Sequence, residues 1–227
     1  MIRAICLLIG YVFGTFQTAF FYGKLHGIDI REHGSGNAGT TNTLRVLGTK
    51  AGLIVFAGDM LKSIIAITIV RLCFAANYPG MEILLVVYTG AGCVLGHNYP
   101  FYMNFKGGKG IATTGGMMIA ANWMYIPVGL LLFFGNFFIT HLVSLGSLLL
   151  YAGFFVQTVI MGECGIFAAS RPVLIELYIV VFLLTVLAFL KHKANISRLI
   201  HGNERKTYLF KKNKMDVETN ASAKENK

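Results

Sequence analysis

Seven apolar stretches run along the chain, separated by shorter polar segments. Most of them approach the length of about 20 residues that a helix needs to cross a bilayer. They occupy residues 2–22, 51–74, 82–100, 110–122, 124–141, 145–162 and 172–190. The fourth and fifth are short or interrupted, and Gly115 and Gly116 weaken a straight helix in the fourth. The pattern predicts an all-α polytopic membrane protein with about seven transmembrane helices.

Composition agrees with this fold class. The 227 residues are 55% hydrophobic and only 13% charged, about half the charged fraction of a soluble domain. The first stretch lacks the polar end and small-residue cleavage site of a signal peptide, so we expect it to be the first transmembrane helix. Residues 1–210 are predicted to form one membrane domain. Residues 211–227 are polar without hydrophobic periodicity, which predicts a disordered cytoplasmic tail.

The distribution of basic residues predicts the orientation. The net charge is +10, and the excess gathers in segments 23–50 and 100–110 and in the tail from Lys191. Seven crossings would put all three basic segments on the same side of the membrane. By the positive-inside rule that side is cytoplasmic, so the N-terminus lies outside. Arg3, Arg71 and Arg171 would then be external, a mild departure from that rule. Basic segments beside a membrane attract anionic lipids and substrates, and we expect no nucleic-acid partner.

The first chemically distinctive segment is residues 34–45. It holds three glycines, four hydroxyls, two amides and Arg45, with no carboxylate. Successive N–H groups in glycine turns can form an anion-binding concavity, and an arginine fork suits phosphate. The segment therefore predicts a phosphate cradle, and the alternative is a flexible polar connector. The candidate binding residues are Gly34, Ser35, Gly36, Asn37, Thr41, Asn42 and Arg45.

The second segment combines Gly96-His97 with the run Phe105-Lys106-Gly107-Gly108-Lys109-Gly110. It lacks the spacing of a Walker A loop. Its glycines could still wrap an anion, with Lys109 as a mobile point charge. The alternative is a loop whose lysines merely obey the positive-inside rule.

The third segment begins at the end of the last span. If that helix continues, Lys191, Asn195 and Arg198 share one face, and His192 is their neighbour. The alternative is a basic anchor beside the membrane. Ser144, at the start of the sixth span, would by itself be a packing residue.

Two charged residues fall inside the second span. Asp59 and Lys62 are three residues apart, and charges in a membrane are usually paired. We expect a structural ion pair that orients this span near the first segment, and the alternative is a direct catalytic role. Elsewhere the closest acidic pair is Asp29 and Glu32. A lone pair of carboxylates supplies few ligands for Mg²⁺, so we expect no metal or cofactor.

Together these segments resemble the acyl-phosphate-dependent glycerol-3-phosphate acyltransferases of bacterial membranes (the PlsY family). The resemblance rests on three signatures in order, and it extends to about Glu204. They are Gly34-Ser35-Gly36-Asn37 with Thr41-Asn42 and Arg45, Gly96-His97 with Phe105 to Gly110, and His192 with Asn195 and Arg198-Leu199. The chain departs from the family pattern at Thr40, Ser63 and Lys191.

The resemblance implies a seven-helix enzyme of the bacterial inner membrane with its active site on the cytoplasmic side. Its reactants would be acyl phosphate and glycerol 3-phosphate, and its products lysophosphatidic acid and phosphate. It implies catalytic roles for Ser35, Arg45, His97, Lys109, His192 and Asn195. It implies substrate-binding roles for Gly34, Gly36, Asn37, Thr41, Asn42, Lys106, Gly107, Gly108, Ser144 and Arg198.

The acceptor of the hydroxyl proton remains open between His97, His192 and a phosphate oxygen of a substrate. No histidine has a carboxylate five residues on, unlike the His-x4-Asp pattern common in acyltransferases with thioester donors. We therefore favour a proton transfer assisted by the substrate.

Two other functions fit the same features. A transporter of an organic phosphate would place its polar site near the bilayer midplane. A scaffold that binds anionic lipid would lose its function on removal of residues 211–227, whereas an enzyme would not. The sequence carries no signal for an oligomeric state.

Overall fold

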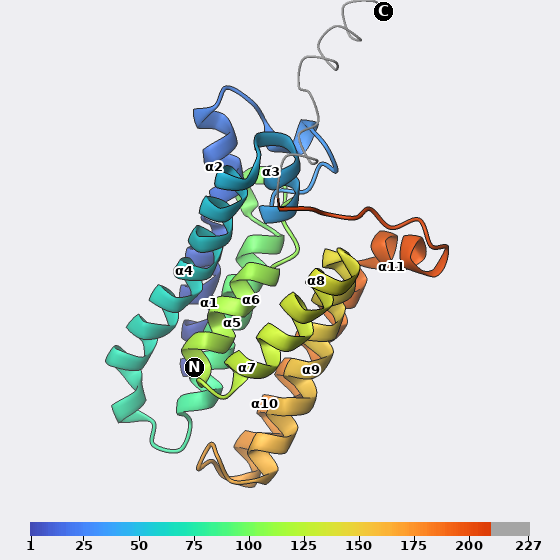
Figure 1. Ribbon diagram of the computed structural model, residues 1–227. Coiled ribbons are helices and arrows are strands. Elements are labelled where there is room, and N and C mark those ends of the chain that lie inside the picture. Colours follow the sequence, from blue (N-terminus) through green and yellow to red (C-terminus); the bar gives the residue numbers. More distant parts are fainter. Residues whose placement is uncertain (210–227) are drawn as a thin grey trace, which may run out of the picture.

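The computed structural model describes residues 1–209, a bundle of helices without a strand in that range (Figure 1). The expected tail at residues 211–227 lies outside the described residues. The elements are α1 (Ile2–Thr15), α2 (Thr18–Leu25), η1 (Ile30–Glu32), α3 (Thr40–Leu47), α4 (Thr49–Phe74), η2 (Ala75–Asn77), α5 (Glu82–Asn98), η3 (Phe101–Met103), α6 (Ile111–Ala121), α7 (Tyr125–Leu130), η4 (Leu131–Gly135), α8 (Asn136–Thr140), α9 (Val143–Glu163), α10 (Arg171–Lys191) and α11 (Lys193–Ile200).

Each apolar stretch is helical, and α4, α5, α6, α9 and α10 begin and end close to their expected bounds. By length and composition, four helical segments could cross a membrane. They are Ile2–Leu25, Thr49–Asn77, Val143–Glu163 and Arg171–Lys191. The structure therefore supports a helical membrane protein.

The first stretch is long and apolar enough to cross a membrane, as expected, but its helix is interrupted. α1 ends at Thr15 and α2 begins at Thr18. The freed carbonyl oxygen of Phe16 accepts a hydrogen bond from Lys62 Nζ at 2.8 Å. Gln17 is fully buried and donates from Nε2 to the carbonyl oxygen of His97 at 2.8 Å. Partners on α4 and α5 thus stabilise the break.

α1 and α5 pack against each other through glycines spaced four residues apart. A Cβ at Gly14 would lie 2.2 Å from the carbonyl oxygen of Cys93. On α5, a Cβ at Gly96 would lie 2.2 Å from the carbonyl oxygen of Tyr11. Only small residues permit such an approach of two backbones. The approach fixes the end of α5, which carries His97.

The fourth and fifth stretches both stay helical. Gly116 does not kink α6, because it packs against α4, where its Cβ would lie 2.3 Å from the carbonyl oxygen of Met60. The fifth stretch runs from α7 to α8 through the π-turn Leu131–Gly135. Wide turns of this kind often occur at functional sites.

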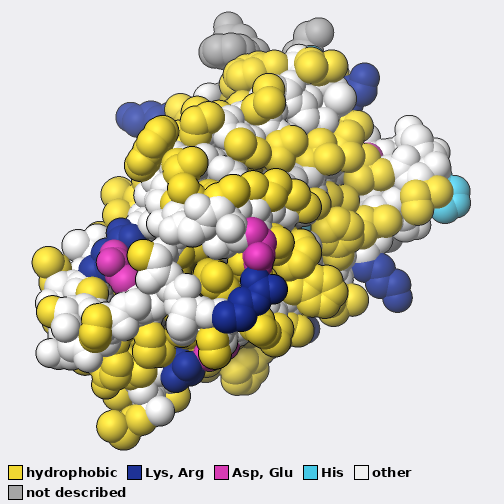
Figure 2. All heavy atoms as spheres, turned by 90° about the horizontal axis from the view of Figure 1, so that it is seen from below, with side chains coloured by type: hydrophobic (Ala, Val, Ile, Leu, Met, Phe, Trp, Pro, Cys, Tyr) yellow, Lys and Arg dark blue, Asp and Glu magenta, His cyan; other side chains and the backbone are white. Residues whose placement is uncertain are grey.

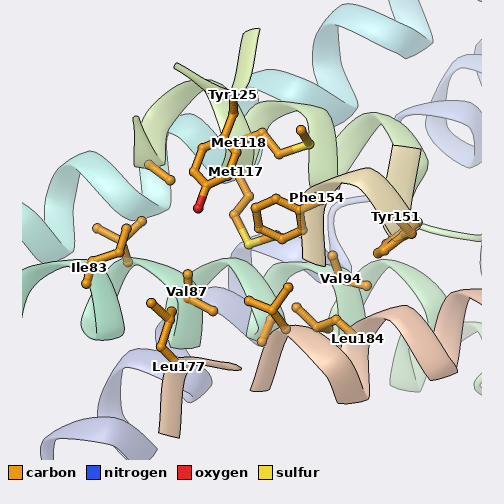
Figure 3. Packing of buried hydrophobic residues seen from close by; sticks show 14 of the residues in the cluster. Ile83, Val87, Val94, Met117, Met118, Tyr125, Tyr151, Phe154, Leu177 and Leu184 are labelled. Carbon is orange, nitrogen blue, oxygen red and sulfur yellow. The ribbon is translucent and has the colours of Figure 1, made fainter. Parts of the chain in front are cut away.

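The main core surrounds α5. Val87 of α5, Met117 of α6, Phe154 of α9 and Leu177 of α10 are nearly or fully buried and meet in one cluster (Figure 3). Tyr125 of α7 joins them, and its hydroxyl is bonded to Thr158 at 2.9 Å.

The last helix breaks at His192, and α11 projects to the side of the bundle (Figure 1). The helix does not continue past the last span, so the condition for one shared face is not met. Lys191 ends α10, whereas Asn195 and Arg198 lie on α11.

Candidate active site

A cavity of about 580 Å³ opens at the end of the bundle. Its lining comes from all three segments with distinctive chemistry. These are the loop and helix 34–45, the turn at Lys109 before α6, and the stretch from Lys191 onward. Segments separated by more than a hundred residues in sequence therefore share one site.

The loop before α3 takes its shape from Asn42, which is 1% exposed. Its Oδ1 accepts from the backbone N–H of Ser35 at 2.7 Å and from the Ser35 hydroxyl at 3.1 Å. Its Nδ2 donates to the carbonyl oxygens of Ile30 and His33, each at 3.0 Å. Gly34 has φ +64, and a Cβ there would lie 2.3 Å from Asn42 Oδ1. Asn42 thus lines the cavity while its polar atoms hold the loop.

Part of the expected cradle of backbone N–H groups is already bonded within the loop. Ser35 donates its N–H to Asn42, Gly36 to the His33 carbonyl, and Gly39 to the Asn37 carbonyl. The first turn of α3 offers further N–H groups to an anion, because no helix bond uses them. Thr40 lies there, and its Oγ1 is buried without a hydrogen-bond partner in the described chain.

Three helices begin at the cavity. Their first turns contribute Thr40 of α3, Ile111 of α6, and Val143 and Ser144 of α9 to its lining. None of the three has an acidic residue in its first turn. Ser144 Oγ is buried and also lacks a partner among residues 1–209. Helix N-termini carry partial positive charge, so three of them favour anions in this cavity.

Basic side chains add full charges. Arg45 donates to Thr207 Oγ1 at 2.7 Å, and Lys109 donates to Asn195 Oδ1. Arg198 pairs with Glu204 at 2.7 Å. Lys191 also lines the cavity, and its Nζ lies 4.5 Å from the centre of the Tyr99 ring. Burial lowers the pKa of Lys109 to about 8, and the neighbouring cations push in the same direction while Glu204 opposes them.

The two histidines of the cavity are held in opposite ways. His97 Nδ1 lies 2.9 Å from the ammonium nitrogen of Lys62. His192 Nδ1 lies 2.7 Å from the carbonyl oxygen of Ala188. A carbonyl only accepts, so Nδ1 of His192 carries the proton and Nε2 keeps a lone pair. Burial lowers the pKa of His192 to about 4, with the charge of Lys109 as a second cause.

One wall of the cavity is aromatic. Phe133, Phe134 and Phe137 line it from the π-turn and α8, and Phe56 lines it from α4. The Phe56 and Phe134 rings meet edge to face, with centroids 6.4 Å apart. A charged group and an apolar chain could therefore occupy the same cavity.

A segment that the sequence did not single out crosses the mouth. The backbone N–H of Thr207 bonds the His141 carbonyl oxygen at 2.9 Å, and Thr207 is 2% exposed. Glu204 accepts from Asn195 at 2.7 Å and holds Arg198. Arg205 and Leu209 also line the cavity. The sequence feature that could have indicated this segment's place at the site is Glu204, a lone carboxylate among basic residues.

Most of the residues expected at the site line the cavity. These are Gly34, Ser35, Gly36, Asn37, Thr41, Asn42, Arg45, His97, Lys109, Ser144, His192, Asn195 and Arg198. Lys106, Gly107 and Gly108 do not. Lys106 is exposed, and the backbone N–H of Gly108 bonds the His97 carbonyl oxygen at 3.0 Å. These two glycines pack the loop against α5 and do not wrap an anion within this cavity.

The fold and cavity define a helical membrane protein with a cavity at one end that basic side chains line. The family model described as glycerol-3-phosphate acyltransferase matches residues 4–202. A protein of that name from Clostridioides difficile (strain 630) is 40% identical over 204 residues, covering 89% of this chain and 94% of its own. One from Bacillus subtilis (strain 168) is 36% identical over 210 residues, covering 91% and 98%. The chain belongs to the glycerol-3-phosphate acyltransferase family.

Solved structures agree with this assignment. The crystal structure of PlsY, an integral membrane glycerol 3-phosphate acyltransferase, in its glycerol 3-phosphate form is 30% identical with a TM-score of 0.76. The match covers 91% of this chain and 96% of that one. The lysophosphatidic acid form is 29% identical with a TM-score of 0.74. The protein is thus an integral membrane acyltransferase, and its family implies phospholipid biosynthesis.

Proposed function

We propose that the protein transfers a fatty acyl group from acyl phosphate to the 1-hydroxyl of glycerol 3-phosphate. The products are lysophosphatidic acid and inorganic phosphate, an early step of bacterial phospholipid synthesis. The observation that carries this proposal is the convergence of basic side chains, three helix N-termini and an aromatic wall on one cavity. The glycerol 3-phosphate and lysophosphatidic acid forms of the related PlsY support the acceptor and the product.

The charge of the cavity favours the acyl phosphate donor. Each reactant carries a phosphate, so bringing both together requires several cations. Arg45, Lys109, Lys191 and Arg198 supply them from different elements. The aromatic wall suits the acyl chain. Arginine forms forked bonds with phosphate, and lysine acts as a point charge.

We assign roles within this site as follows. Ser35, Arg45, His97, Lys109, His192 and Asn195 act on the reacting groups. Gly34, Gly36, Asn37, Thr41, Asn42, Ser144 and Arg198 bind or shape the pocket for the substrates. Gly107 and Gly108 shape the turn that presents Lys109, and Lys106 adds charge at its rim.

The reaction needs positioning more than activation of a protein nucleophile. The hydroxyl oxygen attacks the acyl carbonyl carbon, the new ester bond forms, and the bond from that carbon to the phosphate oxygen breaks. Positioning two reactants can lower the barrier by about 7–11 kcal/mol. A preorganised donor facing the developing oxyanion contributes about 3–4 kcal/mol.

We propose that the hydroxyl proton passes to a phosphate oxygen of a substrate. A phosphate monoester has a second pKa of about 6, so its dianion is a stronger base than His192 with a pKa of about 4. Nε2 of His192 has a lone pair that can accept a hydrogen bond from the 2-hydroxyl of glycerol 3-phosphate, which orients the acceptor and leaves the 1-hydroxyl hydrogen for the phosphate oxygen. No metal or cofactor enters this scheme.

We also propose that the chain crosses the bacterial inner membrane seven times, with the N-terminus outside and the cavity on the cytoplasmic side. The bias of basic residues toward the cavity end supports this orientation. The placement of the cavity at one end of the bundle favours the enzyme over a transporter, whose site would lie near the midplane.

The test is a reconstituted assay. Purified protein in detergent receives radiolabelled glycerol 3-phosphate with acyl phosphate, acyl-CoA or acyl carrier protein as donor. We expect lysophosphatidic acid from acyl phosphate alone, with equal rates in the presence of EDTA. Product from a thioester donor alone would overturn the donor assignment, and loss of turnover with EDTA would overturn the metal-free scheme.

A further inference from the structure

Lys62, deep in α4, uses all three of its ammonium hydrogens within the protein. Its Nζ lies 2.8 Å from the Phe16 carbonyl oxygen, 2.9 Å from Asp59 Oδ1 and 2.9 Å from His97 Nδ1. The Lys62 and Asp59 side chains are 4% and 2% exposed. An ammonium has three donors and no acceptor. Lys62 therefore has no hydrogen left for a substrate.

This arrangement determines the tautomer of His97. Because the ammonium can only donate, Nδ1 of His97 must accept, and the ring proton must sit on Nε2. The backbone around the ring is held as well, since the His97 carbonyl oxygen accepts from Gln17 and Gly108. In this state Nε2 can donate a hydrogen bond but cannot take up a proton.

Nε2 lies at the edge of the cavity. His97 lines the cavity, and a Cβ at Gly108 would lie 2.0 Å from Nε2, so this nitrogen lies against the residue before Lys109. In residues 1–209 no group forms a hydrogen bond with Nε2. A donor without a partner in a cavity that Lys109 also lines is suited to an anionic oxygen of a reactant.

We infer that Lys62 and Asp59 are positioning residues that hold His97 as a hydrogen-bond donor, through Nε2, to a phosphate or carbonyl oxygen of a reactant in the cavity. Asp59 accepts one hydrogen bond from the Lys62 ammonium and holds it in place, and Lys62 directs another of its hydrogens to Nδ1 of His97. The inference rests on the proposed function for the identity of the reactant, but the tautomer is a property of the protein alone.

The tautomer is tested first. Protein labelled with ¹⁵N-histidine is studied by NMR near neutral pH, and the His97 signals are those lost in His97→Gln. We expect an unprotonated Nδ1 and a protonated Nε2 in the wild type. A proton on Nδ1 would overturn the inference whatever the enzyme makes, so this result does not depend on the proposed function.

The second test asks whether Lys62 acts through His97. Removing Lys62 alone would leave Asp59 as an unpaired buried charge, which can unfold the protein. The variant is therefore Asp59→Asn with Lys62→Met, compared with His97→Ala and with all three changes combined. The loss of one preorganised donor lowers turnover by about 10²–10³-fold. We expect the combined variant to be no slower than His97→Ala, because residues that act as a unit are not additive. Losses that multiply would assign the pair to folding alone.

The third test separates a donor from a base. The side-chain amide nitrogen of glutamine can replace Nε2–H, but glutamine cannot accept a proton near neutral pH. His97→Gln should therefore keep at least tenfold more turnover than His97→Ala, with thermal melts of both variants as the folding control. Equal losses would overturn the donor role. If the wild type made no product from acyl phosphate, the proposed function would fail, and the NMR result would still decide the tautomer.

Discussion

The two ends of the bundle differ in how many of their basic side chains are paired with a carboxylate. At the end away from the cavity, Arg3 pairs with Glu176 at 2.5 Å, Arg71 with Glu82 at 2.9 Å, and Arg171 with Glu163. Figure 2 shows this end, where basic side chains lie against acidic ones between hydrophobic groups. At the cavity end Arg198 is paired with Glu204, but Arg45, Lys109 and Lys191 have no carboxylate within salt-bridge distance in the described chain.

We interpret the paired arginines as structural and the unpaired cations of the cavity as functional. A neutralised arginine carries no net charge, so these three arginines are compatible with the external side on which our proposed orientation places them. Unneutralised cations in a buried cavity cost free energy. Their presence makes sense if anionic substrates supply the missing charge.

The largest effect is expected from the cavity end. Arg45→Ala and Lys109→Ala should each reduce turnover at least 10²-fold, since each removes a cation facing phosphate. The matched control is Arg171→Ala, whose pair with Glu163 is exposed and far from the cavity. Thermal melts should be similar for all three variants. Near-normal turnover in either cavity variant would remove that residue from the site.

The pH dependence gives the next largest effect. Lys109 is charged below its pKa of about 8 and neutral above it, so kcat/KM for glycerol 3-phosphate should fall by up to tenfold per pH unit above about pH 8. Lys109→Arg keeps the charge and should move the fall to higher pH. A profile that stays level from pH 7 to 10 in the wild type would contradict this account.

At the opposite end the expected effect is on stability. Glu176 is 28% exposed and also accepts from Tyr88 at 2.8 Å. Arg3→Ala should lower the free energy of unfolding by about 1 kcal/mol, because it breaks a charged, partly screened hydrogen bond. Turnover should not change. A loss of activity at unchanged melting temperature would contradict the division between the two ends.

The smallest effect concerns Glu204. Its charge raises the pKa of Lys109, so Glu204→Gln should move the alkaline fall of kcat/KM to lower pH. Glu32→Gln, an exposed carboxylate outside the cavity, is the control. An unchanged profile in Glu204→Gln would show that this carboxylate does not act on Lys109.

Much of this architecture can be predicted from short stretches of the sequence. Long apolar runs predict α4, α5, α9 and α10 because a membrane helix needs little else. The bias of basic residues also predicts that the loop at Arg45, the turn at Lys109 and the stretch after Lys191 share one end of the bundle. Local composition does not reveal which atoms are already in use. The side-chain amide of Asn42, for example, is already bonded inside the loop, where its Nδ2 donates to the carbonyl oxygens of Ile30 and His33.

The features that were missed depend on distant partners. The break after Thr15 is stabilised by Lys62 and His97, and the turn at His192 lets α11 reach Lys109 and Glu204. Helical periodicity cannot indicate such breaks. Gln17 within an apolar run was the available signal for the first, because a buried amide needs partners. The glycine spacings at Gly10–Gly14 and Gly92–Gly96 were the signal for the close packing of α1 and α5.

The central claim is that one cavity holds two phosphorylated reactants at the same time. The most direct measurement is binding of radiolabelled glycerol 3-phosphate to protein saturated with a non-reactive acyl phosphonate. The account predicts that glycerol 3-phosphate still binds, in a ratio of about one per protein. Mutually exclusive binding of the two ligands would contradict it, because the cations would then serve a single phosphate.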